Sequence, residues 1–303
     1  MRLVECVPNF SEGRDRGIVD AIVAAIKQHP IHVLDVSLDA DHHRSVVTFV
    51  GEPQPVEEAA FSAIMTAAEL IDLTVHQGVH PRIGAADVVP FIPLRNISLS
   101  ECAAVAERLG QRVGEAGLPV YLYEAAARRM ERRNLADVRR GGYEALRGEI
   151  SLRARLPDFG PAVLGKAGAV AIGARAPLIA FNVYLNTDDV EIARDIARAV
   201  RTSDGGLPHV KALGLRVNGM AQVSMNLTDF RVTSLYQAVN AVRSHAARHG
   251  VEIASSELIG LIPQSALLDY ALESLLLPPD TKAKILETAV GVATGDYRPI
   301  IFE

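Results

Sequence analysis

The residues from His76 to Asp87 (HQGVHPRIGAAD) place two histidines, an arginine and an aspartate between apolar segments. Two histidines four residues apart, His76 and His80, could bind zinc from one face of a helix. Gly78 and Pro81 disfavour such a helix, and the glutamate of an HExxH motif is absent. The sequence therefore predicts a polar loop with no metal site.

His80 stands directly before a proline, which pushes its backbone towards an extended conformation. A histidine in a polar loop can act as a general acid or base near neutral pH. The same pattern also fits a histidine that only satisfies loop carbonyls. The residues alone leave both interpretations open.

Two earlier segments could bind an anion. Residues 7–13 (VPNFSEG), which include Asn9, stand between a predicted strand and a predicted helix, where α/β proteins often bind ligands. The start of that helix would offer free backbone N–H groups to a carboxylate. Residues 39–44 (DADHHR) form a charged turn, and Arg44 enters the strand that follows. An ordinary capped turn and a solvated turn are the alternatives.

Six arginines follow in a stretch that we expect to be helical, and they are Arg128, Arg129, Arg132, Arg133, Arg139 and Arg140. They indicate either a solvated helix face or donors for an anionic ligand. The glycine-rich residues 160–168 could approach a ligand through their backbone, but they match neither a Walker loop nor GxGxxG. A nucleotide is therefore not predicted, and without a GxSxG elbow neither is serine-hydrolase chemistry.

Composition narrows the class of protein. The 303 residues carry a formal net charge of −5, which argues against nucleic acid as the main partner. Residues 1–6 (MRLVEC) do not resemble a signal peptide, and no apolar run is long enough to cross a membrane, so we expect a cytoplasmic protein. The two cysteines, Cys6 and Cys102, are expected to be reduced and buried.

Hydrophobic patterns predict the elements that position these residues. In the first half, helices are expected from 18 to 26, after Pro53, and from 100 to 115, with strands at 3–7, 33–36, 45–50 and 119–123. In the second half, strands are expected at 178–185, 210–217, 221–227 and 251–259. One helix is expected to begin at Thr187 or Asp188 as its N-cap, a second to run from 234 to 249, and a third to begin after Pro263.

Both halves thus follow the order strand, helix, strand, strand, helix, strand, which is typical of split-βαβ units. The sequence predicts an α/β protein of the α+β sandwich kind, with two subdomains that are each a mixed β-sheet with helices on one side. Proline and glycine are dense from 157 to 173, so we place the subdomain boundary near its end, giving residues 1–175 and 176–303.

Several separated motifs together resemble one family, that of the formiminotransferase domain. They are LVECVPNFSEG at 3–13, HQGVHPRIGAADVVPFIP at 76–93, PVYLYEAAAR at 119–128, PDFGP at 157–161, LIAFNVYL at 178–185, AQVSMNLTDF at 221–230 and ELIGLIPQSALLDYA at 257–271. The resemblance runs from Leu3 to about Ala293. It is more specific than any single motif, because the motifs follow one another in the family's order.

The resemblance implies a homodimer in which two subdomains face each other across a substrate groove. It implies tetrahydrofolate as the co-substrate that accepts the group, N-formimidoyl-L-glutamate as the donor, and His80, in the His-Pro-Arg motif, as the catalytic residue. The implied folate-binding residues are Gly160, Pro161, Ala162, Val163, Leu164, Gly165, Lys166, Ala167 and Gly168.

Two features depart from the family pattern. The folate-binding stretch is one residue shorter than is common, and position 43, often asparagine, is histidine. The chain has no room after Ala293 for the cyclodeaminase domain that some relatives carry, so we expect the single-activity form, with a separate cyclodeaminase as a candidate partner.

The implied reaction assigns roles to several residues. N5 of tetrahydrofolate attacks the amidine carbon, and one histidine can take its proton and return it to the departing glutamate nitrogen. Asp35 or Asp87 could orient the cationic amidine, while Arg44 and Arg82 suit the two carboxylates of the glutamate moiety. Asn9 is a further candidate contact.

Two other functions remain possible at this point. The same site could exchange a formyl group between folate and glutamate, because an amide and an amidine differ by one atom. The other possibility is a folate-binding protein without catalytic activity. The intact His-Pro-Arg motif argues against it.

Overall fold

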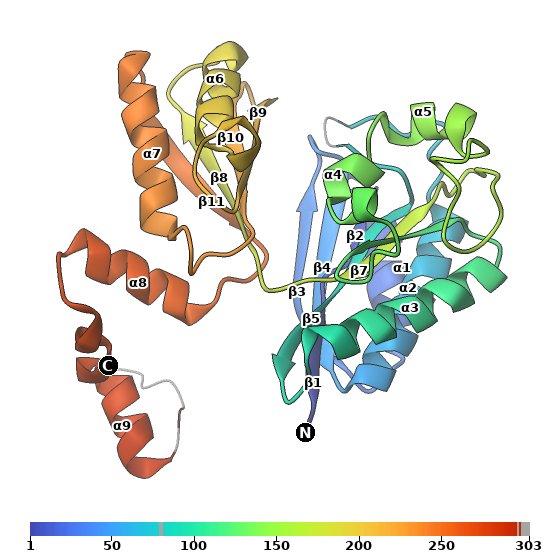
Figure 1. The fold of residues 1–303 in the computed structure, drawn as a ribbon, viewed down its shortest axis with the longest axis horizontal. Coiled ribbons are helices and arrows are strands. Elements are labelled where there is room, and N and C mark those ends of the chain that lie inside the picture. The colour runs from blue at the N-terminus through green and yellow to red at the C-terminus, as the bar shows by residue number, and fades with distance from the viewer. Residues whose placement is uncertain (79–80, 296, 298–303) are drawn as a thin grey trace. The chain divides into compact units, whose positions relative to one another are not determined.

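The computed structural model describes residues 1–78, 81–295 and 297. The chain divides into two compact units, Met1–Pro177 and Leu178–Glu303, which we call unit 1 and unit 2 (Figure 1). Each unit has its own hydrophobic core and is described by itself.

Unit 1 contains one seven-stranded sheet and five α-helices among its described residues. In chain order its elements are β1 (Leu3–Cys6), β2 (Asn9–Phe10), α1 (Arg16–Ile26), β3 (His32–Asp39), β4 (Arg44–Gly51), α2 (Pro53–Leu70), β5 (Ala86–Arg95), α3 (Leu99–Glu115), β6 (Val120–Glu124), a 3₁₀ turn (Met130–Arg132), α4 (Leu135–Val138), α5 (Gly142–Glu149) and β7 (Val170–Ala174).

The sheet of unit 1 is mixed. β4 pairs antiparallel with β3 on one side and with both β1 and β2 on the other. β5 pairs antiparallel with β1 and β2, and it then pairs in parallel with β7, which in turn pairs in parallel with β6. β1 and β2 therefore act as one interrupted strand between β4 and β5.

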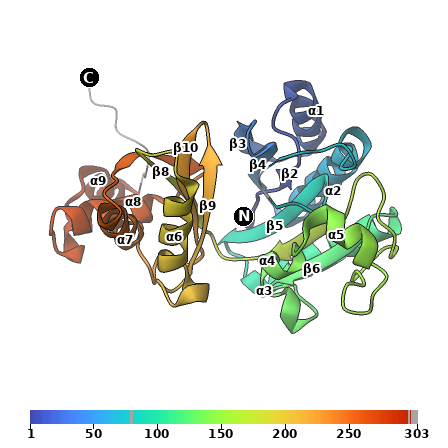
Figure 2. The same cartoon turned by 90° about the horizontal axis from the view of Figure 1, so that it is seen from above.

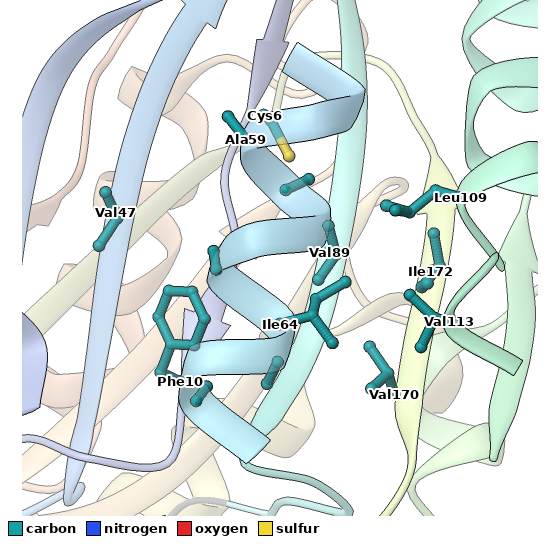
Figure 3. Packing of buried hydrophobic residues seen from close by; sticks show 14 of the residues in the cluster. Cys6, Phe10, Val47, Ala59, Ile64, Val89, Leu109, Val113, Val170 and Ile172 are labelled. Carbon is teal, nitrogen blue, oxygen red and sulfur yellow. The ribbon is translucent and has the colours of Figure 1, made fainter. Parts of the chain in front are cut away.

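The main core of unit 1 lies between this sheet and helices α1, α2 and α3. Figure 3 shows Phe10 and Val89 beside Ile64, with Val47, Leu109 and Ile172 in the same cluster. Side chains cap two of the helices: Asp15 accepts backbone N–H groups of α1, and Ser98 forms a capping box with Glu101 at α3. These caps fix the residues at which α1 and α3 begin.

The opposite face of the sheet has its own covering near β6 and β7. Tyr121, Tyr123 and Ala171 pack there with Val138 of α4 and Leu146 of α5. The expectation of helices on one side only is therefore wrong for unit 1. The arginine-rich stretch also does not form one helix, because it divides into the 3₁₀ turn, α4 and α5.

Unit 2 has a four-stranded sheet in the order β11-β8-β10-β9. Its elements are β8 (Ile179–Leu185), α6 (Val190–Val200), a 3₁₀ turn (Thr202–Asp204), β9 (Val210–Val217), β10 (Met220–Leu227), α7 (Leu235–Arg248), β11 (Ile253–Ile259), α8 (Gln264–Ser274), a 3₁₀ turn (Pro279–Lys284) and α9 (Leu286–Thr294). All its strand pairs are antiparallel, so the expected mixed sheet is wrong for this unit.

Local sequence explains the hairpin and helix starts of unit 2. Asn218 and Gly219 both have positive φ, 50° and 76°, as a type I′ turn between β9 and β10 requires. Ser234 forms a capping box with Gln237 at α7. Asp189, rather than Thr187 or Asp188, is the N-cap of α6.

The two units share one topology. In unit 2 the order of neighbouring strands is fourth, first, third, second, and unit 1 has the same arrangement if β1 and β2 count as its first strand. Figure 2 shows β8, β10 and β9 of unit 2 and β2, β3, β4 and β5 of unit 1 in a second view. Unit 1 adds α3, β6 and β7 beyond its fourth strand. The predicted split-βαβ order is confirmed in both halves, while a groove between the sheets stays a prediction.

Cys6 and Cys102 are buried free thiols, as expected. Within the described residues, no helix has both the length and the apolar character needed to span a membrane.

Candidate functional site

A buried carboxylate, Asp87, lies at the centre of a charged cluster in unit 1. Asn9 pairs with Val88 and Phe10 with Ala86, so Asp87 is an extra residue that bulges from β5. Such a bulge redirects a side chain away from the regular alternation of the strand. The side chain of Asp87 has no exposed surface, and its Oδ1 accepts the backbone N–H of Ile83 at 2.9 Å.

Two arginines share the other oxygen of Asp87. Arg44, the first residue of β4, donates from Nη1 to Asp87 Oδ2 at 2.8 Å, and Arg139, just after α4, donates to the same oxygen from Nη2. Asn9 Oδ1 accepts Arg44 Nε–H at 3.0 Å, which orients the guanidinium. The structure thus brings together three of the predicted substrate residues, Asn9, Arg44 and Asp87, and adds Arg139.

The charges in this cluster are strongly coupled. Burial alone would raise the pKa of Asp87, but Arg139 and Arg44 outweigh it and lower that pKa to about 2. Burial also lowers the pKa of Arg44 to about 10; Asp87 opposes the change, and the nearby charge of Arg139 adds to it. Near neutral pH the cluster therefore holds one negative and two positive charges.

Asp35 lies apart from this cluster. Asp35 pairs with Thr48 on β4. Thr48 is four positions beyond Arg44, a separation of roughly 13 Å along the strand. The Asp35 carboxylate accepts the Ser37 hydroxyl at 2.7 Å. In the described part of the chain, Asp35 forms no ion pair with the arginines.

The loop before β5 is held by Arg82. Its Nε donates to His76 Nδ1 at 2.8 Å and its Nη2 to the His76 carbonyl at 2.9 Å. The same guanidinium makes two hydrogen bonds to Glu144 of α5, at 2.8 and 3.1 Å. Four donor contacts within the protein commit Arg82 to positioning this loop, which leaves it little capacity to bind a substrate carboxylate.

These contacts determine the tautomer of His76. Because Arg82 donates to Nδ1, that nitrogen carries no proton, and Nε2–H donates to the His43 carbonyl at 3.0 Å. Burial lowers the pKa of His76, and the charges of His43 and Arg82 lower it further, against the opposing effects of the His43 carbonyl and Glu12. His76 is therefore a neutral structural histidine, with its lone pair already occupied.

His43 packs against His76, with ring centroids 4.1 Å apart and planes 9° from parallel. Its ring nitrogens face two acceptors, Glu12 Oε1 at 3.1 Å and the Gln77 carbonyl at 3.0 Å. Glu12 also accepts the backbone N–H groups of Arg14 and Asp15, which, with His43, lower its pKa although burial raises it. His43 has φ 48°, a left-handed conformation that asparagine and histidine adopt more readily than most residues.

The glycine-rich stretch meets this loop through the backbone. Ala85 N–H donates to Ala167 O, and Ala169 N–H donates to Ile83 O, both at 2.8 Å. A Cβ on Gly84 would lie 2.0 Å from Ala169 O, so the two segments approach too closely for another residue there. The predicted catalytic loop and the predicted folate stretch are thus side by side.

Only part of the glycine-rich stretch 160–168 is exposed. Pro161, Val163, Gly165 and Lys166 are exposed, whereas Ala167 and Gly168 are buried. Gly160 is needed for packing, since a Cβ there would lie 2.2 Å from Leu118 O. Residues 161–166 therefore offer an accessible backbone surface against which a flat ring could lie.

A cavity of about 370 Å³ is lined by residues 73–77 and by Tyr143, Glu144 and Arg147. Tyr143 donates its hydroxyl to Gly165 O at 3.3 Å, which joins the cavity wall to the glycine-rich stretch. The catalytic candidate, His80, lies outside the described residues. Among those residues, no group of three or more potential ligands is placed to hold a metal ion.

Sequence reasoning placed Glu12 and His43 within candidate segments and Arg139 among six candidate arginines, without giving any of them a role of its own, and it missed Glu144. Arg139 was one of six arginines that could not be told apart by pattern. Of the others, Arg132 is buried against Asp158, and Arg128 pairs with Glu107. Burial and partners separate these roles, and neither can be read from spacing.

Fold and site together define an α/β protein of two split-βαβ units whose first unit carries a buried charged cluster beside a histidine loop. The sequence profile of the formiminotransferase domain, N-terminal subdomain, matches residues 3–175, and that of the formiminotransferase domain matches residues 180–276. The chain belongs to the formiminotransferase domain family.

Curated relatives are similar along almost the whole chain. A glutamate formimidoyltransferase from Thermoplasma acidophilum is 50% identical over 293 residues, covering 95% of this chain and 97% of the relative. One from Streptococcus pyogenes serotype M1 is 44% identical, covering 89% and 92%. A formimidoyltransferase-cyclodeaminase from Rattus norvegicus is also 44% identical, but only 52% of its length is covered.

Proposed function

We propose that this protein is a glutamate formimidoyltransferase, which moves the formimidoyl group of N-formimidoyl-L-glutamate to N5 of tetrahydrofolate. The products are 5-formimidoyltetrahydrofolate and L-glutamate. The observation that supports the proposal is the backbone pairing of residues 83–85 with residues 167–169, which holds the segment that we propose for the donor beside the segment that we propose for folate. Two substrates held side by side are what a direct group transfer requires.

In the proposed reaction, the N5 lone pair of tetrahydrofolate attacks the amidine carbon, and an N–C bond forms. His80 accepts the proton that N5 then loses. The bond from carbon to the glutamate nitrogen breaks as His80 returns the proton to that nitrogen. One histidine thus serves as base and then as acid, a role worth about 10²- to 10⁴-fold in rate.

The surrounding residues have supporting roles in this proposal. Arg44 binds a carboxylate of the donor, and Asn9 and Asp87 orient it. Asp35 is on the same sheet face and is the candidate to orient the cationic amidine. Arg82 holds the loop through His76 and Glu144 instead of binding substrate. Residues 160–166 contact the folate.

The test is a turnover assay with both substrates for the wild type, His80→Ala and a control, His249→Ala. His249 is an exposed residue at the end of α7 in unit 2. We expect product from the wild type and from the control, and a rate at least about 100-fold lower for His80→Ala. If the wild type turns over only N-formyl-glutamate, the donor assignment is wrong.

We also expect a homodimer, which light scattering on the purified protein would reveal. A separate cyclodeaminase is a candidate partner that would consume the product.

A further inference from the structure

In the charged cluster of unit 1, one carboxylate serves two guanidinium groups. Arg44 and Arg139 share the single carboxylate of Asp87, and no other acid among the described residues forms an ion pair with Arg139. The side chains of Arg139, Arg44 and Asp87 are only 12%, 10% and 0% exposed. An excess charge removed from water is unfavourable unless another group compensates for it.

The two arginines are not equivalent. Arg44 is fixed by Asn9 and Asp87 together, while Arg139 has one hydrogen-bonded anchor on Asp87. The Nε of Arg139 is buried, and no described residue forms a hydrogen bond with it. A guanidinium with unused donors, held beside a second one, matches the planar oxygen pair of a carboxylate.

We propose that Arg139 is a substrate-binding residue that, together with Arg44, binds one carboxylate of the glutamate moiety of the donor. Asp87 is the positioning residue that holds the two arginines together. The bound carboxylate restores neutrality: two guanidinium groups then face two carboxylates. The identity of this anion rests on the proposed function, whereas the existence of the anion site does not.

Charge balance predicts an unusual stability effect. Arg44 and Arg139 donate to the same oxygen of Asp87, so in the absence of ligand the two guanidinium groups repel each other; Arg139→Gln removes this repulsion and leaves the hydrogen bond from Arg44 to Asp87 in place. We therefore expect Arg139→Gln to unfold at a temperature no lower than the wild type. A purely structural arginine would give a clear decrease in that temperature.

The experiment compares the wild type, Arg139→Lys, Arg139→Gln and the control Arg140→Gln. Arg140 is the exposed neighbour, paired with Asp137. We expect the KM for N-formimidoyl-L-glutamate to rise about 10- to 100-fold in Arg139→Gln, as for the loss of a hydrogen bond to a charged group. Arg139→Lys should show a smaller rise, and kcat and the KM for tetrahydrofolate should change less than about threefold in both.

Calorimetric titration with L-glutamate measures the site without turnover. Loss of glutamate binding in Arg139→Gln, but not in Arg140→Gln, supports the inference even if the wild type transfers no formimidoyl group, in which case only the proposed function fails. Normal turnover by the wild type with an unchanged KM and unchanged glutamate binding in Arg139→Gln overturns the inference and leaves the function standing. If Arg139→Gln does not fold, a structural role is shown and the inference is also overturned.

Discussion

The polar sheet faces of the two units are built on equivalent strands and differ in charge. In unit 1 the acid of the fourth strand, Asp87, binds Arg44 of the third strand, and Asn9 of the first strand orients that arginine. In unit 2 the acid of the fourth strand, Glu257, accepts Asn182 Nδ2–H at 3.2 Å and the Tyr184 hydroxyl at 3.1 Å, both from the first strand. The third strand of unit 2 contributes Gln222 instead of an arginine.

This difference shows how one topology can hold two kinds of binding surface. The helix-facing side of each sheet is apolar, so on this side the two units can differ only in how their side chains pack. The opposite side holds an ionic cluster in unit 1 and an acid with uncharged partners in unit 2. The ionic face suits an anion, while the face of unit 2 suits a neutral group that both donates and accepts hydrogen bonds.

The largest expected effect breaks the ionic side of this comparison. Asp87→Asn removes the negative charge that the buried guanidinium groups of Arg44 and Arg139 share, so we expect the free energy of unfolding to fall by about 3–5 kcal/mol. Glu257→Gln keeps an oxygen that accepts from Asn182 and Tyr184, so we expect a loss below about 1.5 kcal/mol. Denaturant unfolding followed by circular dichroism measures both. Equal losses would show that the two faces do not differ in the way described.

The wild type and Asp87→Asn should differ in how their stability depends on pH under acidic conditions. The folded pKa of Asp87, about 2, is below its usual value of 3.8, so its contribution to stability is present above 3.8 and is lost as the pH falls towards 2. We expect the gap between wild type and Asp87→Asn to narrow over that range. A gap that stays constant down to pH 2 would contradict the assignment.

A smaller effect concerns His76, which has no counterpart on the face of unit 2. Its pKa is lowered from 6.5, so as the pH falls below 6.5 the unfolded chain takes up a proton that the folded protein does not. The groups that face it are His43, Glu12 and Arg82. Stability should therefore fall with pH by at most about 1.4 kcal/mol per unit below 6.5.

His76→Gln tests this dependence, because glutamine can still accept from Arg82 and donate to the His43 carbonyl but does not titrate. Unfolding at pH 7.5 and 5.5 should show a smaller decrease in the variant than in the wild type. His249→Ala is the control, since His249 is exposed. An identical decrease in wild type and His76→Gln would mean that His76 is protonated in the folded protein.

The sequence predicted the elements of both units well, because their apolar residues recur with clear helical and strand periods. It also named Asn9, Arg44 and Asp87 as candidate substrate contacts; the structure brings these three together, and their binding of substrate stays a prediction. It did not predict that Arg82 is committed to His76 and Glu144. That pairing depends on where α5 lies, 62 residues further along the chain, which no local pattern encodes.

The same limitation explains Arg139 and the second face of the sheet in unit 1. Six similar arginines have equal standing in a sequence, and only the packing of α4 over β6 and β7 brings Arg139 to Asp87. The mixed sheet predicted for unit 2 failed for another reason. Strand order along the chain does not state strand direction, which follows from how β8 and β11 pair.

The smallest expected effect concerns Gln222 on the polar sheet face of unit 2. Gln222 has no exposed surface, and within the described part of the chain neither Oε1 nor Nε2 of its amide has a hydrogen-bond partner. An unsatisfied buried amide is unfavourable, so Gln222→Leu should raise the free energy of unfolding by about 1 kcal/mol, while Gln111→Leu, at an exposed position on α3, should change it less. Steady-state kinetics on the same variants show whether a ligand uses the amide. If Gln222→Leu is more stable and has a higher KM for either substrate, this face of the sheet binds a neutral polar group. If Gln222→Leu is less stable than the wild type, Gln222 has hydrogen-bond partners in the folded protein.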